Sequence, residues 1–270
     1  MLRQVSLRES FAKDSGSASQ LLSQYVGDVL RPAFPFPGET EEEEVYRDYL
    51  TGGLPNWDAH ILYNESGEMI GGIQGQILDV GQGPRSRWTW LEHLFFKPSF
   101  QRQGNLSEAL ELAKQIALAA GAWAIFGEHN NPREMTAEEI EEDAQGGLPT
   151  LERLQIWAKE SLGIHVLVVD SGERPMVPYA QVGMGDQAPV TFLGLQFIGL
   201  SSNLAEEGIT AEEYLKLYRT AMETIPGIDY HRDSTCRMVQ KAVTAVASAV
   251  TGPFVFVPFG SYYHREISSK

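Results

Sequence analysis

The sequence predicts an α/β fold, with a mixed and mostly antiparallel central sheet that is flanked by helices. Apolar runs at residues 60–63, 69–80 and 88–96 are separated by turn residues, which predicts three consecutive antiparallel strands. Apolar residues at helical spacing begin at Leu106, and a further apolar run spans residues 123–126. The central part of the chain is therefore predicted to be three strands, a helix and another strand.

Short helices and one strand are predicted before this central part. Residues 3–7 fit a short strand, and an apolar face at helical spacing predicts a helix over residues 17–30. Prolines make residues 31–38 irregular. Thr40 with Glu43 three residues later has the pattern of a capping box, which predicts the start of a second short helix.

Glycines lie inside the second of the three predicted strands. Gly71, Gly72 and Gly75 fall within residues 69–80, after a glycine-containing turn at residues 64–68. Glycine inside a strand usually marks a bulge or the close approach of another backbone. We expect the sheet to bend or to pack closely at these positions.

The junction between the third strand and the next helix has the features of an anion-binding site. Residues 90–96 are apolar and aromatic, and a Gln-Arg-Gln-Gly-Asn turn leads from them into an amphipathic helix. The first N–H groups of a helix lack intrahelical partners and the helix dipole adds positive charge, so a phosphate is stabilised there. Gly104 lets the backbone approach a ligand closely, and Arg102 supplies side-chain donors. The alternative is an ordinary strand-to-helix turn with a glycine.

This segment resembles the acetyl-CoA-binding motif of the GNAT superfamily of N-acetyltransferases, which reads Gln or Arg, two residues, Gly, one residue, then Gly or Ala. Leu106 departs from the last position of that pattern, which bears on how closely the helix start packs on the cofactor. Upstream, the strand end has the family's apolar-x-apolar-x-Pro run, which ends at Pro98. The resemblance implies acetyl-CoA or another acyl-CoA as co-substrate, held by Leu94, Phe95, Phe96, Gln101, Arg102, Gln103, Gly104, Asn105, Leu106 and Ser107.

Polar residues follow the strand at residues 123–126. Glu128, Asn130 and Pro132 match a Glu-x-Asn-x-Pro sequence that many GNAT relatives have here, and the resemblance implies that Asn130 contacts the cofactor. A polar loop exit, with Asn and Pro as turn formers, is the alternative. Residues 132–148 are acidic and predict a mobile excursion or a short surface helix.

The proton donor that the family commonly uses has no direct match in this chain. Residues 150–162 predict a helix that resembles the one closing the acetyl-CoA site, where a tyrosine commonly protonates the departing thiolate; Trp157 stands there instead. An indole N–H is not a useful acid. Tyr179 begins a Tyr-x-Gln sequence that resembles a motif of some relatives, so it is a candidate for substrate contact or thiolate protonation. Packing is the alternative role for Tyr179.

Two carboxylates are candidates for the base that deprotonates an attacking amine. Glu92 is the first choice, because it lies mid-strand among apolar residues where burial raises a carboxyl pKa. Its alternative is a carboxylate satisfied by a neighbouring arginine. Glu128 is the second choice. The family implies that a backbone N–H of residues 90–96 stabilises the oxyanion.

The resemblance divides the chain into residues 1–200, an acyl-CoA-binding domain, and residues 201–270, a C-terminal extension packed on it. Helical spacing predicts helices at about residues 210–225 and 234–250, and residues 254–258 fit a final strand. Three roles for the extension stay open: to cover the acceptor side, to complete the sheet, or to mediate dimerisation.

The composition of the chain limits the classes of partner that we expect it to bind. A net charge of -15 argues against nucleic acid and anionic membranes and is compatible with a cationic amine. The chain has no apolar run of membrane-spanning length and no secretory signal, so we expect a cytoplasmic protein. The single cysteine, Cys236, excludes a multi-cysteine zinc site and is expected to be a small buried apolar residue; no metal is expected.

These features predict an acyl-CoA-dependent N-acyltransferase, in which an amine attacks acetyl-CoA directly. The acceptor is expected to be a small-molecule amine or a peptide amine, and homodimer formation is left open. One alternative is a GNAT-like module that binds or senses acyl-CoA without catalysis, which Leu106 and Trp157 favour. A structural protein that assembles through its C-terminal helices is the third class.

Overall fold

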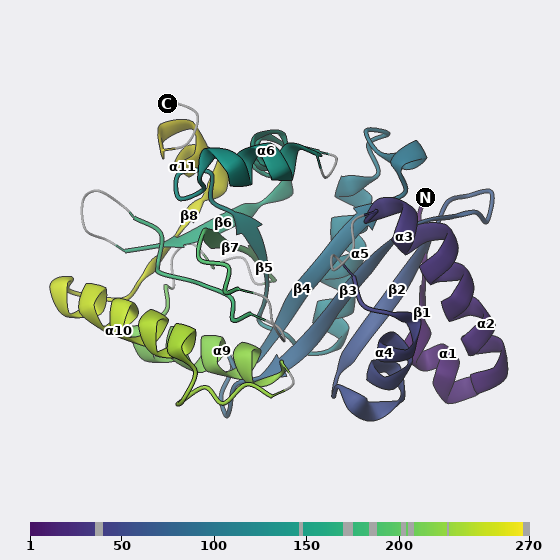
Figure 1. The fold of residues 1–270 in the computed structure, drawn as a ribbon, viewed down its shortest axis with the longest axis horizontal. Helices are drawn as coiled ribbons and strands as arrows, with labels where there is room; N and C mark the ends of the chain where they lie inside the picture. Colours follow the sequence, from purple (N-terminus) through teal and green to yellow (C-terminus); the bar gives the residue numbers. More distant parts are fainter. Residues whose placement is uncertain are drawn as a thin grey trace. The chain divides into compact units, whose positions relative to one another are not determined.

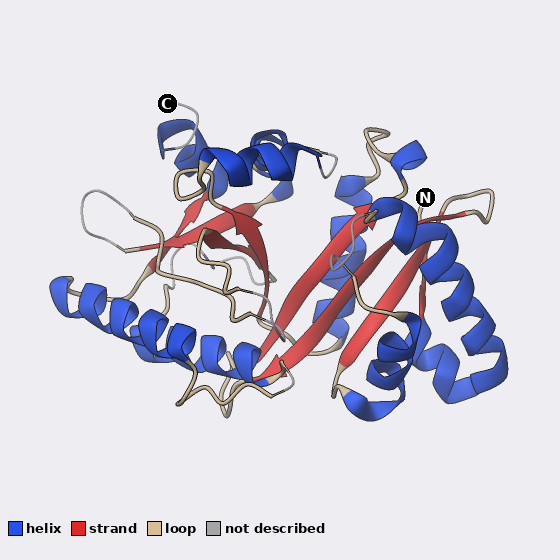
Figure 2. Cartoon of the chain, viewed as in Figure 1, coloured by secondary structure: helices blue, strands red, loops and turns tan. Residues whose placement is uncertain are grey.

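A computed structural model describes residues 1–35, 40–145, 148–169, 175–183, 188–200, 204, 208–225 and 227–266. The chain forms two compact units, one of Met1–Ile77 and Thr89–Gly121 and the other of Leu78–Trp88 and Ala122–Lys270. Strands and helices occur in both units, and the neighbouring strands whose register the structure describes are antiparallel, which confirms the predicted fold class (Figures 1 and 2). The predicted boundary after residue 200 concerns the extent of the family domain, and it stays a prediction.

Four strands in the order β1-β2-β3-β4 form the sheet of the first unit. The last residues of β3 and the first residues of β4 belong to the second unit. Their bounds are β1 Arg3–Ser6, β2 Trp57–Tyr63, β3 Met69–Asp79 and β4 Arg87–Phe96. Ser6 pairs with His60 across β1 and β2, and Asp58 pairs with Gly75 across β2 and β3. The predicted hairpin is therefore present.

Helices cover this sheet, and α5 is seen behind β3 and β4 in Figure 1. The helical segments are α1 Leu7–Lys13, α2 Ser15–Tyr25, η1 Val26–Leu30, α3 Arg31–Ala33, α4 Glu43–Asp48, η2 Tyr49–Gly53, η3 Pro98–Phe100 and α5 Leu106–Ala119, of which η1 and η2 are π-helical and η3 is a 3-10 turn. Side chains of α2 and α4, such as Leu22 and Tyr46, pack with Trp57 and Ile61 of β2 in the core.

Two predictions for the N-terminal helices are wrong in detail. The helix expected over residues 17–30 begins at Ser15, where the Asp14 side chain caps it, and its last part, Val26–Leu30, is π-helical. The capping box at Thr40 is absent, because α4 begins after Glu42 and no side chain of the described residues caps it. Acidic residues in the first turn of α4 are themselves favourable at a helix N-terminus, so a cap is not needed to start the helix there.

The glycines of β3 allow the close approach that the sequence predicts. A Cβ atom at Gly71 would overlap the carbonyl oxygen of Phe95, and one at Gly75 would overlap that of Trp90. The backbone of β4 therefore comes too close to β3 for a side chain at either position, which is the close approach that glycine permits.

The second unit contains strands in the order β5-β7-β6-β8. Their bounds are β5 Ala124–Asn130, β6 Ile164–Val168, β7 Leu193–Gly199 and β8 Val255–Pro258. Strand β8 comes from the C-terminal extension and pairs antiparallel with β6, His165 facing Pro258. Of the three roles left open for the extension, completion of the sheet is therefore observed.

The described helices of this unit are α6 Ala137–Gln145, α7 Thr150–Trp157, η4 Glu160–Leu162, α9 Ala211–Glu223, α10 Ser234–Ala249 and α11 Phe259–Glu266. Helices α9 and α10 lie side by side in Figure 1 and contact each other. Helix α11 was not expected from the sequence. Cys236 is buried on α10, as predicted. No helix among the described residues is both long and apolar enough to cross a membrane.

Candidate active site

The turn between β4 and α5 has an unusual backbone at two positions. Arg102 has a φ angle of 60° and Gly104 one of 82°, both in the left-handed region. Such angles cost a residue with a side chain about 1–2 kcal/mol but cost glycine little. A Cβ atom at Gly104 would meet nothing within 4 Å, so the backbone there faces open space. The turn is exposed on the surface of the first unit.

The N-terminus of α5 follows this turn without a side-chain cap among the described residues. Its N-cap residue is Asn105, whose side-chain nitrogen donates instead to the carbonyl oxygen of Phe100 at 3.4 Å. The first N–H groups of α5 and the positive end of the helix dipole are thus available to an anion. Leu106, the position that departs from the family pattern, is half-buried, and Ser107 is exposed.

The two glutamines of the motif shape the turn. Gln101 Nε2 donates to the carbonyl oxygen of Phe96 at 3.3 Å, and Gln103 Nε2 donates to that of Ser99 at 2.7 Å. These bonds tie the turn to the end of β4 and to η3. Arg102 between them is exposed, so it brings positive charge to the surface of the turn.

The apolar side chains at the end of β4 pack into the core. Phe95 and Phe96 are buried, and Leu94 is half-buried. The ring of Phe95 packs against those of Tyr25 and Phe34, with centroids 6.2 and 5.0 Å apart. Any contact of Phe95 with a cofactor therefore falls to its backbone.

Glu92 of β4 is held by a tryptophan of β2 in the same unit. Its Oε2 accepts a hydrogen bond from Trp57 Nε1 at 2.7 Å. The Trp57 ring is stacked on Tyr46, with centroids 5.6 Å apart, and meets Tyr49 edge-on at 5.4 Å. The carboxylate is half-buried beside this aromatic group. No local pattern singles out Trp57, because its contact with Glu92 spans 35 residues.

His93 is a residue of β4 that the sequence prediction did not consider. Its Nδ1 is buried, and burial lowers the pKa of the imidazole to about 4. Its ring meets Phe34 edge-on at 4.9 Å. His93 is therefore neutral near pH 7. No local pattern in the sequence singles out His93, which directly follows Glu92.

In the second unit, the structure brings two of the predicted catalytic residues together. The Tyr179 hydroxyl donates a hydrogen bond to Glu128 Oε1. Burial raises the pKa of the Glu128 carboxyl from 4.5 to about 7, although the bond from Tyr179 acts in the opposite direction. Burial also raises the pKa of Tyr179 well above 10, and the Glu128 charge adds to this. The pKa of the Glu128 carboxyl thus lies close to neutral pH.

Asn130, predicted to contact the cofactor, takes part in a polar network of the second unit. Its Nδ2 donates to Asp143 Oδ1 at 3.0 Å and to Thr150 Oγ1 at 3.3 Å. Asp143 also accepts from the Thr150 hydroxyl at 2.7 Å and forms an ion pair with Arg153. The side-chain N–H groups of Asn130 are therefore used within the protein. Trp157 lies half-buried at the end of α7.

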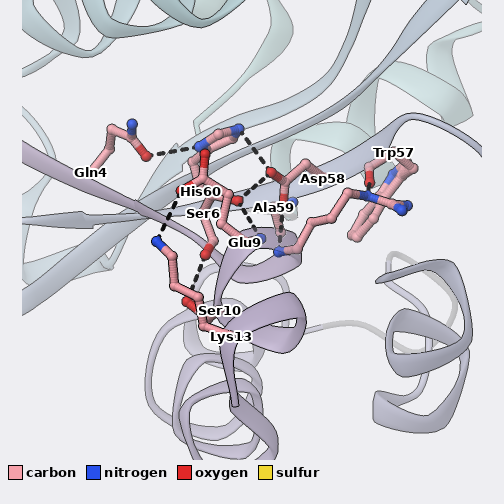
Figure 3. Close-up of polar contacts among 10 residues, drawn as sticks. Gln4, Ser6, Glu9, Ser10, Lys13, Trp57, Asp58, Ala59 and His60 are labelled. Carbon is pink, nitrogen blue, oxygen red and sulfur yellow. Dashed lines mark hydrogen bonds and ion pairs between the residues drawn. The ribbon is translucent and has the colours of Figure 1, made fainter. Parts of the chain in front are cut away.

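One cluster in the first unit contains a serine, an aspartate and a histidine but not the geometry of a nucleophilic triad (Figure 3). Ser6 Oγ donates to Asp58 Oδ2 at 2.6 Å and accepts from the backbone N–H of Glu9, which caps α1. His60 Nδ1 lies 2.8 Å from Gln4 Oε1. A triad needs the serine hydroxyl on the imidazole, whereas Ser6 donates to Asp58. The cluster joins α1 to β2. In the described part of the chain, no group of three or more His, Cys, Asp or Glu could hold a metal.

Comparisons with known proteins agree with the strand, turn and helix of the first unit. Residues 24–135 match the model of the acetyltransferase (GNAT) family. No curated protein matches the chain by sequence. Solved structures with a similar fold include a Chaetomium thermophilum protein in complex with a bisubstrate analogue, at 15% identity over 77% of this chain and 90% of that chain, with a TM-score of 0.43.

Two further similar structures are distant as well. One is an aminoglycoside acetyltransferase from an uncultured soil metagenomic sample, with 18% identity over 54% of this chain and 86% of that chain and a TM-score of 0.33. The other is a GNAT family acetyltransferase from Elizabethkingia anophelis with acetyl-CoA bound, with 14% identity over 64% and 88% of the two chains and a TM-score of 0.34. The family match supports an N-acetyltransferase. Residues 24–135 of this chain are therefore similar to the acetyltransferase (GNAT) family.

Proposed function

We propose that the protein is an acyl-CoA-dependent N-acyltransferase, which transfers an acetyl group from acetyl-CoA to a small-molecule amine or a peptide amine. One observation carries the proposal: the exposed turn from Gln101 to Asn105 presents a left-handed Gly104 and an uncapped helix N-terminus. Backbone N–H groups at such a helix start bind phosphate oxygens. The open space at Gly104 fits a pyrophosphate that approaches the backbone.

Different residues of the turn would bind the CoA phosphates and hold the turn in shape. The N–H groups from Gly104 to Ser107 would bind phosphate oxygens, and Arg102 would add a charged donor. Gln101 and Gln103 would fix the shape of the turn through their bonds to backbone carbonyls. Leu94, Phe95 and Phe96 would meet the pantetheine arm with their backbone, as neighbouring strands meet.

We assign the base to Glu128 ahead of Glu92, which reverses the order expected from the sequence. A base works best when its pKa lies near the working pH, and the Glu128 carboxyl has a pKa of about 7. Tyr179 holds that carboxylate and is a candidate to return a proton to the leaving thiolate. Glu92 carries a negative charge beside Trp57, Tyr46 and Tyr49, a setting that attracts a cationic amine.

The test combines binding and turnover. Calorimetry with acetyl-CoA and with CoA should give saturable binding, and CoA at a hundred times its dissociation constant should add about 2.7 kcal/mol to the free energy of unfolding. A thiol-release assay with a panel of primary amines should then show amine-dependent cleavage of acetyl-CoA. Binding without cleavage would replace the enzyme by an acyl-CoA sensor, and absence of binding would remove both functions.

A further inference from the structure

Two tyrosines of α9 bind the backbone on either side of Tyr179. The Tyr214 hydroxyl donates to the carbonyl oxygen of Pro178 at 2.9 Å, and the Tyr218 hydroxyl donates to that of Ala180 at 2.9 Å. Both tyrosines are buried, with 1% and 2% of their surface exposed. One helix of the C-terminal extension therefore holds both neighbours of Tyr179.

The spacing of the two tyrosines matches that of the two carbonyls. Residues four apart on a helix lie on one face, about 6 Å apart along its axis. Alternate residues of an extended chain are about 6.6 Å apart and point their carbonyls the same way. The backbone around Tyr179 is anchored in this form, because Met176 and Gln181 on its two sides form antiparallel bridges with Val168 and Val190. One turn of α9 can therefore bond two alternate carbonyls at once.

The two hydrogen bonds from Tyr214 and Tyr218, here called the clamp, determine where the Tyr179 side chain points. With the carbonyls of Pro178 and Ala180 fixed towards α9, the residue between them has little freedom to rotate about the chain. Its ring also meets that of Tyr218 edge-on, with centroids 5.6 Å apart. The hydroxyl of Tyr179 is thereby held on the Glu128 carboxylate.

We propose that Tyr214 and Tyr218 are positioning residues, which act by holding the Tyr179 hydroxyl on Glu128. The inference rests on the proposed function for its catalytic meaning, and it gives α9 of the extension a part in that function. The clamp itself has a consequence that does not depend on catalysis. Because the bond from Tyr179 lowers the pKa of the Glu128 carboxyl, its loss should raise that pKa.

The experiment follows the titration of Glu128 in the intact protein by carbon-13 NMR of the glutamate side-chain carboxyl carbons. Absence of a signal in Glu128→Gln assigns the resonance. Tyr179→Phe shows how far the Glu128 midpoint moves when the hydrogen bond is lost completely. Tyr214→Phe and Tyr218→Phe are tested singly and together. Tyr230→Phe is the control. Tyr230 is buried with its ring 6.1 Å from that of Tyr218, and the same ring contacts His231 and the Arg219 guanidinium.

The double variant should raise the Glu128 midpoint in the same direction as Tyr179→Phe, by up to about one pH unit, as loss of one hydrogen bond to a carboxylate gives. The control should leave the midpoint in place. An unmoved midpoint in a folded double variant overturns the clamp, and so does an equal shift in Tyr230→Phe. If the double variant does not fold, the single variants decide by the same readout. Wild-type amine acetylation is measured separately, so a failed transfer assay counts against the proposed function and leaves the clamp intact.

Discussion

Trp57 of β2 donates its indole N–H to Glu92 Oε2 of β4 at 2.7 Å. This hydrogen bond holds the Glu92 carboxylate in place within the first unit. The bond gives Glu92 a defined orientation in an aromatic setting, since Trp57 is itself stacked on Tyr46. A glutamine at position 92 would still offer a carbonyl oxygen to the indole. Exchange of Glu92 for glutamine therefore removes the charge and keeps the contact.

The two carboxylates can be separated by matched substitutions. We expect Glu128→Gln to lower the rate of acetyl transfer about 10²- to 10⁴-fold, because loss of a general base has that range of effect. Glu92→Gln should lower the rate less than about tenfold and raise KM for a cationic amine, because it removes only an attractive charge. Steady-state kinetics over a range of pH measures both. The reverse ranking would return the base to Glu92.

The pH dependence of stability offers a second test of Glu128. Its folded-state pKa of about 7 lies above the usual 4.5, so between these values the folded protein binds more protons than the unfolded chain. Stability from this group is complete below pH 4.5 and is lost as the pH rises through about 7. Glu128→Gln cannot ionise, so its advantage over wild type should grow across that window.

The size of this advantage is on the order of 1–3 kcal/mol by pH 8, since each pH unit between the two pKa values contributes up to about 1.4 kcal/mol. Urea unfolding of both proteins at several pH values gives the difference directly. Glu92→Gln serves as the comparison with the same change in net charge. A difference between Glu128→Gln and wild type that stays constant from pH 5 to pH 8 would show that Glu128 titrates normally.

Local patterns made the turn between β4 and α5 predictable from sequence, whereas the partners of the candidate site residues were not predictable. Apolar spacing places α5, and Gly104 marks the turn, because both depend on residues close in the chain. Tyr179 and Glu128 are 51 residues apart and meet only through the fold of the second unit. Each was a candidate by itself, but neither pattern indicates that one bonds the other.

The partners of Asn130 were not predictable from the sequence either. The sequence motif predicts that it contacts the cofactor, and that contact stays a prediction. Its amide N–H groups are bonded to Thr150 and to Asp143, and Asp143 comes from a segment whose acidic composition suggested only a surface excursion or short helix. Helix α11 was missed because it follows β8 without a loop, so no turn residue separates the two elements.

The serine of the N-terminal cluster should matter for stability and not for chemistry. Ser6→Ala removes both the cap of α1 and the bond to Asp58, and caps of this kind contribute about 0.5–2 kcal/mol. We expect thermal or urea unfolding to show a loss of this size. The rate of acetyl transfer at a temperature where both proteins are folded should be unchanged. A loss of rate without a loss of stability would contradict the structural role.

The last prediction concerns the phosphate turn. Gly104→Val should abolish CoA binding, because a branched side chain would fill the open space where the backbone meets phosphate. The folded protein should survive, since the new side chain meets no other group and adds only the strain of a positive φ angle, about 1–2 kcal/mol. Arg102→Ala should weaken binding by about 1.5–3 kcal/mol, the range for a charged hydrogen bond. Calorimetry with CoA measures both effects.

Gly67 provides the matched control for this substitution. It lies in the turn between β2 and β3 with a φ angle of 79°, and a Cβ there would likewise meet nothing within 4 Å. Gly67→Val therefore adds similar backbone strain in the same unit, away from the β4 to α5 turn. We expect it to lose stability as Gly104→Val does and to bind CoA as the wild type does. If both variants lose CoA binding, strain explains the effect; if neither does, the phosphates are held elsewhere.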